Sequence, residues 1–162
     1  MRGTALFVGI GSPHGDDRAG WLVADALAQA CAHVAAPTNG GSALRRTVTI
    51  RKAGVPADLL DWMEGAATLI VCDAVRGAGM PGTLHQWRWP DAGIERYHSA
   101  GSHDLGLSGV LELAEKLGRL PPEVIVWGIE IGPVVPAAGA SPQVLEALPD
   151  LVRRIWSELF HA

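Results

Sequence analysis

The stretch Ala-Leu-Phe-Val-Gly-Ile, residues 5–10, decides how this chain is expected to fold. An apolar run of this length that ends at a glycine is typical of a strand buried on both faces, as in a parallel sheet. A turn over residues 11–17 follows, and apolar residues then recur every three or four positions from Ala19 to Ala30. That spacing predicts a helix with one apolar face. A buried strand followed directly by such a helix indicates an α/β fold.

The same alternation continues along the rest of the chain. We expect further strands over residues 47–51, 68–72 and 124–129, an edge or antiparallel strand over 82–89, a loop over 35–46, and helices over 56–64, 107–117 and from Ser141 onward. Pro149 should break or restart the last helix, because proline cannot donate a helical hydrogen bond. We therefore predict a single three-layer domain over residues 1–162, with a mostly parallel twisted sheet, helices on both faces and one antiparallel edge strand.

The composition narrows the class of protein. Hydrophobic residues make up 48% of the chain and charged residues 19%, which favours a packed core over disorder. The net charge of −4, with scattered basic residues, argues against a nucleic-acid partner. No apolar run reaches the roughly 18 residues of a membrane span, and Cys31 and Cys72 match no zinc or redox spacing. We expect a cytoplasmic monomer that binds neither nucleic acid nor membrane.

Acidic and histidine residues follow the predicted strands at one end of the sheet. In an open parallel sheet, the loops that leave the carboxyl ends of the strands build the ligand site. Asp17 follows the first strand, Asp73 follows the strand over 68–72, and His103 lies just before a predicted helix. We expect these three side chains to converge. Two carboxylates and one imidazole would form a metal site with open coordination positions.

Each of these residues also has a structural explanation. Asp16 and Asp17 both suit a helix start, but one carboxylate is enough for a cap, and Asp16 is the expected one. Asp73 could cap the turn that follows it, although an acid directly after Leu-Ile-Val-Cys is costly to bury without a partner. The histidines that are given packing or capping roles are His14, His33, His85 and His161.

Two other functions compete with this metal site. The glycines at 9, 11 and 15 give G-x-G-x-x-x-G rather than the dinucleotide spacing, and the acidic pair would repel a pyrophosphate. The acidic pair and Asp73 also resemble the magnesium site of a phosphoacceptor receiver domain. Such domains need a lysine after the last core strand, and residues 127–133 contain none. A receiver-like protein remains the alternative.

Four segments carry a resemblance to a known family. They are Gly9–Ser12 with Asp16–Gly20, Ile70–Val75 with Gly79–Thr83, Ser102–Leu107, and Gly128–Ile131 with Ala140–Pro142. In this order and spacing they resemble the motifs of the hydrogenase maturation endopeptidases. The resemblance covers most of the chain, and its strength lies in four weak motifs that occur together.

The resemblance implies both a site and a reaction. In that family, an acid of the first block, the aspartate of the second and the histidine of the third bind metal, which assigns the metal-binding and catalytic roles here to Asp17, Asp73 and His103. The implied enzyme removes a C-terminal peptide from the large-subunit precursor of nickel–iron hydrogenase. Nickel would be presented by the precursor, and carboxylate and imidazole ligands also suit other divalent ions as substitutes. A nickel-site chaperone without protease activity is a further alternative on the same fold.

Three departures from the family pattern bear on the substrate. Ser12 stands where the family usually has asparagine, and its turn is one residue shorter. Asp17 is shorter than the glutamate of some members, and Ala53-Gly54-Val55 replaces a Gly-Gly-Thr-like turn. These differences leave the target hydrogenase open and do not change the expected class of enzyme.

Overall fold

The computed structural model describes residues 3–34, 46–77, 79–97, 105–136 and 138–161. Its elements are, in chain order, β1 (Ala5–Ile10), the 3-10 turn η1 (Gly15–Arg18), α1 (Ala19–Val34), β2 (Val48–Ala53), the 3-10 turn η2 (Pro56–Asp61), β3 (Thr68–Val75), β4 (Leu84–Arg88), α2 (Ala92–Tyr97), α3 (Leu107–Lys116), β5 (Glu123–Glu130) and α4 (Pro142–His161). The strands form one sheet in the order β2-β1-β3-β5-β4. β4 runs antiparallel to β5, and the other neighbouring pairs are parallel. The predicted single α/β domain is confirmed.

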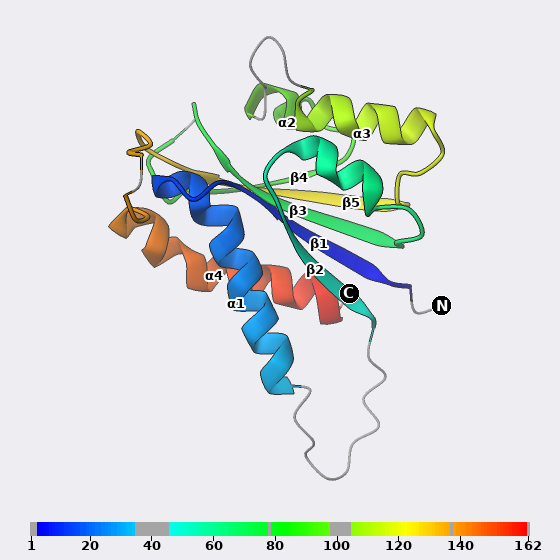
Figure 1. The fold of residues 1–162 in the computed structure, drawn as a ribbon, viewed down its shortest axis with the longest axis horizontal. Coiled ribbons are helices and arrows are strands. Elements are labelled where there is room, and N and C mark those ends of the chain that lie inside the picture. Colours follow the sequence, from blue (N-terminus) through cyan, green and yellow to red (C-terminus); the bar gives the residue numbers. More distant parts are fainter. Residues whose placement is uncertain (1–2, 35–45, 78, 98–104, 137, 162) are drawn as a thin grey trace.

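Helices cover both faces of the sheet (Figure 1). Alternate side chains of each strand point to opposite faces, so the sheet contributes to two separate clusters of buried residues. Phe7 and Ile70 belong to the cluster under α1 and α4. Val8 and Val71 belong to the cluster under η2, α2 and α3. The central strands β1 and β3 are therefore the near-continuous apolar runs that a doubly covered parallel sheet requires.

Two glycines let α1 begin directly against the sheet. A Cβ on Gly9 would lie 2.0 Å from the carbonyl oxygen of Gly20. A Cβ on Gly20 would lie 2.2 Å from the carbonyl oxygen of Ile10 and 2.7 Å from that of Cys72. Any larger residue would push the helix away, so this contact holds the η1 turn close to the end of β3.

The last helix differs from its prediction. α4 runs from Pro142 to His161 with Pro149 inside it, so the expected break at this proline is wrong. The apolar stripe of α4 continues on both sides of the proline, with Val144, Leu151 and Ile155 fully buried against the sheet. Burial of such side chains contributes about 1.5–3 kcal/mol each. Together they outweigh the roughly 3 kcal/mol that an interior proline costs.

Other elements also differ from their predicted bounds or were not predicted. β3 continues to Val75, three residues beyond its predicted end, so Asp73 lies inside the strand. The short helix α2 had no predicted counterpart. The expected loop over 35–46 lies outside the described residues except for Arg46. Within the part of the chain that is described, no helix is both long and apolar enough to cross a membrane.

Candidate functional site

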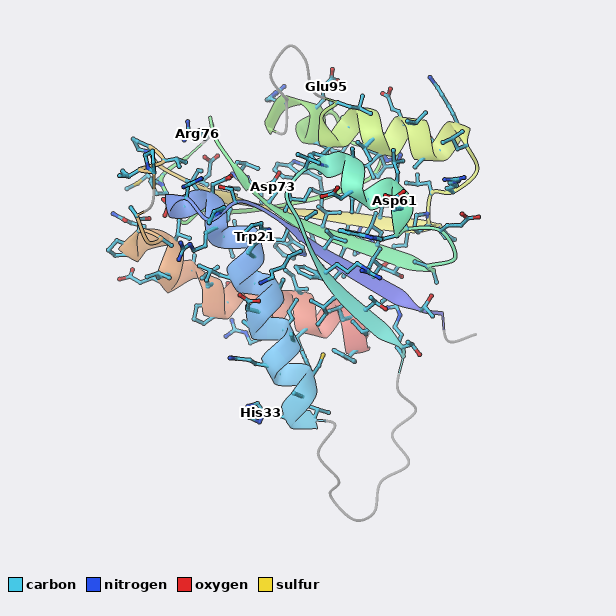
Figure 2. The ribbon with its side chains drawn as sticks, viewed as in Figure 1. Trp21, His33, Asp61, Asp73, Arg76 and Glu95 are labelled. Atoms are coloured by element: carbon cyan, nitrogen blue, oxygen red, sulfur yellow. The ribbon has the colours of Figure 1, made fainter. Side chains whose placement is uncertain are left out.

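Asp17 lies in η1, just after β1, and Asp73 lies near the end of the neighbouring strand β3, so both residues are at the carboxyl edge of the sheet. β1 ends at Ile10, and η1, which bears Asp17, folds back so that the Ser12 N–H donates to the Asp17 carbonyl oxygen at 3.1 Å. Asp73 lies near the end of β3, the strand beside β1. Figure 2 shows Asp73 and Arg76 at this end of β3. The charge of Asp17 is felt at Asp73, and the site that the two residues are predicted to form stays a prediction.

The register of β3 determines which face Asp73 occupies. Leu69 and Val71 belong to the buried cluster under η2 and α3. Since side chains alternate along a strand, Asp73 points to the same face of the sheet as these two residues. That is the face covered by α3, the helix that the predicted histidine block precedes.

Without a bound cation, the carboxylates of Asp17 and Asp73 lie in an unfavourable electrostatic setting. Asp73 is partly buried, and loss of hydration raises its pKa well above the ordinary value of 3.8. The negative charge of Asp17 raises the pKa further, whereas a hydrogen bond from the Ala74 backbone lowers it. Burial and a like charge both disfavour the ionised form. A cation bound between the two side chains would offset both effects.

Asp16 has a different role from the one its position suggested. It is 4% exposed, and its Oδ1 and Oδ2 accept hydrogen bonds from the Ser141 N–H at 2.5 Å and the Ser141 hydroxyl at 2.9 Å. Ser141 in turn is the N-cap residue of α4, because its Oγ accepts from the Val144 N–H at 3.5 Å. The expected cap for the helix that follows Asp16 is therefore wrong. Asp16 instead anchors the start of α4.

His103 lies outside the described residues, as do His98, Ser102 and Asp104. α3 begins at Leu107 with Gly106 in the N-cap position. Across the described ranges, no group of three or more His, Cys, Asp and Glu side chains could hold a metal ion. The third ligand of the predicted site therefore stays a prediction, and the two aspartates are the part of it that the structure brings together.

Comparisons with known proteins support the motif-based expectation. The family model described as hydrogenase maturation protease (HycI) matches residues 33–158. The chain belongs to the hydrogenase maturation protease family. Among its members, the maturating endopeptidase HybD of Escherichia coli superposes with a TM-score of 0.73 at 22% identity, covering 96% of this chain and 91% of that one.

Solved structures from other organisms share this fold. The hydrogenase 2 maturation peptidase of Thaumarchaeota archaeon SCGC_AB-539-E09 gives a TM-score of 0.61 at 26% identity, covering 96% of this chain and 97% of that one. HybD of Thermococcus kodakarensis gives 0.66 at 19% identity, covering 97% and 99%. The comparison with curated protein sequences found no match. Family membership makes the chain a hydrolase and removes the reason to consider a receiver domain.

The polar pair formed by Glu130 and His85 was not predicted from the sequence. Glu130, at the end of β5, is 1% exposed, and its Oε1 lies 3.1 Å from Nε2 of His85 on the neighbouring strand β4. The His85 ring also stacks on Trp87, with 5.4 Å between the ring centroids. His85 was expected to have a packing or capping role, and pairing with a buried carboxylate is a more specific one. The available signal was an acid at the end of an apolar strand, which is costly without a partner.

Proposed function

We propose that this member of the family is a metal-dependent endopeptidase that removes the C-terminal peptide of a nickel-loaded nickel–iron hydrogenase large-subunit precursor. The observation that supports this most directly is the approach of Asp17 to Asp73 at the carboxyl edge of the sheet. Two carboxylates held together in a partly buried position are a suitable oxygen donor set for a divalent ion. Nickel already bound in the precursor serves as a checkpoint, because cleavage then follows correct loading of the substrate.

The residues proposed to hold the metal are Asp17, Asp73 and His103. A divalent ion held there would supply Lewis-acid chemistry, either by polarising the scissile carbonyl or by activating a water molecule. The donor set suits several divalent ions, so zinc or cadmium can replace nickel as a probe of the site.

Asp73 is the site carboxylate whose setting is least favourable without a cation, since burial and the charge of Asp17 both raise its pKa. The neighbouring thiol is unsuited to act as a nucleophile. Cys72 is fully buried, and burial together with the charge of Asp73 raises the pKa of its thiol, so it stays protonated at neutral pH. Water is therefore the proposed nucleophile.

Cleavage of the precursor by single variants tests the proposal. The purified chain is incubated with nickel-loaded and nickel-free precursor, and the mass of the large subunit is followed over time. We expect Asp17→Asn, Asp73→Asn and His103→Ala each to slow cleavage by about a thousandfold or more, and the nickel-free precursor to remain uncut. Asp25→Asn is the matched control, because Asp25 is 58% exposed and pairs only with Lys52 among the described residues.

The outcomes separate the candidate functions. A site variant that cleaves at close to the wild-type rate would remove that residue from the site. A wild-type chain that binds the precursor but never shortens it would favour the nickel-site chaperone. The proposed enzyme is a cytoplasmic monomer, and sedimentation of the purified chain tests its oligomeric state.

A further inference from the structure

Two of the exposed apolar side chains lie on the loops that leave the ends of β3 and β5. Met80 follows β3 and is 79% exposed, and Val135 follows β5 and is 58% exposed. We call this pair the apolar rim. An exposed apolar side chain is ordinary when it is isolated, but both of these lie on loops that adjoin the candidate site: one follows β3, which bears Asp73, and the other contacts η1, which bears Asp17.

The backbone that presents the rim is held in place by contacts between loops. The Thr83 N–H and hydroxyl both donate to the Met80 carbonyl oxygen, at 3.1 Å and 2.7 Å. A Cβ on Gly132 would lie 3.6 Å from Cγ of Pro81, so the loop after β3 touches the loop after β5. A rigid presentation of exposed apolar side chains lowers the entropic cost of binding a partner.

The rim is continuous with the turn that carries Asp17. A Cβ on Gly15 would lie 3.2 Å from the backbone N and O of Val135, and the Gly15 N–H donates to the Ala138 carbonyl oxygen at 2.9 Å. Figure 1 shows the segment after β5 beside the start of α1. Val135 therefore packs against Gly15 in η1. Gly15 is two residues before the candidate ligand Asp17.

We propose that the apolar rim binds an apolar segment of the substrate polypeptide next to the scissile bond. This inference rests on the proposed protease function. A chain whose peptide bond reaches Asp17 and Asp73 must cross the adjoining loops. Residues 79–83 and 131–136 contain no ionisable side chain, so the complementary segment is uncharged. Methionine, with its flexible side chain, adapts to apolar partners of different shape.

Steady-state cleavage kinetics test the rim. Wild type, Met80→Ser, Val135→Ser and the double variant are compared over a range of nickel-loaded precursor concentrations. We expect the double variant to raise KM by about tenfold or more with kcat changed less than about twofold, because the rim binds the substrate without touching the reacting atoms. Leu117→Ser is the control: Leu117 is 54% exposed but lies between α3 and β5, at the opposite edge of the sheet.

Each outcome bears on one hypothesis. A double variant with wild-type KM overturns the rim proposal. So does a double variant that changes sedimentation without changing KM, which would assign the rim to contact with a second copy of the chain. If wild type does not cleave the precursor, the proposed function fails, and the rim is then judged by precursor binding alone. In that case, equal affinities of wild type and double variant overturn it.

Discussion

Asp16 and Asp17 are adjacent in the chain, yet their carboxylates lie in opposite electrostatic surroundings. Asp16 is almost fully buried, and each of its oxygens accepts a hydrogen bond from Ser141. Asp17 is partly buried, and its charge raises the pKa of Asp73. A buried carboxylate with neutral donors stabilises the fold, whereas two carboxylates that oppose each other create a place for a cation. One turn therefore serves both structure and function.

The largest difference between the site carboxylate Asp73 and the structural carboxylate Asp16 should appear in metal affinity. We expect Asp73→Asn to weaken zinc binding by about a hundredfold or more, because it removes a charged ligand, and Asp16→Asn to weaken it by less than about tenfold. Isothermal titration of the metal-free chain measures both values. Equal losses in the two variants would mean that the two carboxylates do not have separate roles.

The next effect is on stability and belongs to Asp16. Asp16→Ala leaves the Ser141 N–H and hydroxyl without their acceptors, so we expect the free energy of unfolding to fall by about 2–3 kcal/mol. Urea denaturation gives this value. The exposed Asp25→Ala should change it by less than about 1 kcal/mol, since an exposed ion pair contributes little.

Asp73→Asn should raise the free energy of unfolding of the metal-free chain, whereas Asp16→Ala lowers it. The pKa of Asp73 is raised in the folded chain, so the folded state binds more protons than the unfolded state, and its stability falls as pH rises from 3.8 through the raised pKa. The variant lacks this loss. We expect the metal-free variant to be more stable than wild type by about 1 kcal/mol at neutral pH, with the difference disappearing below pH 3.8. A less stable variant at pH 7 would contradict the unfavourable setting of Asp73.

The smallest effect concerns the partner of Asp16. Ser141→Ala removes one of the two hydrogen bonds to Asp16 and the side-chain cap of α4, but it keeps the N–H donor. We expect a loss of about 1 kcal/mol. In the double variant with Asp16→Ala, the two losses should not add, because both residues belong to one network. Additive losses would show that the two residues act independently.

The regular part of the fold was predictable because its signals are local. The apolar run at 5–10 and the helical spacing after Ala19 both predicted their elements, and the topology rule then brought Asp17 and Asp73 to one edge. Contacts between distant residues were not predictable in this way. The partner of Asp16 lies 125 residues away, and the burial that keeps α4 intact through Pro149 depends on the finished sheet. The His103 prediction is untested, because this residue lies outside the described ranges.

The tie between Asp16 and Ser141 also has a consequence for the order of events during synthesis. Asp16 is made before its partner, which follows 125 residues later. Until then, the turn that presents Asp17 lacks its anchor, because the start of α4 is not yet in place to provide one. A nascent chain therefore completes its acidic turn only after Ser141 has been made.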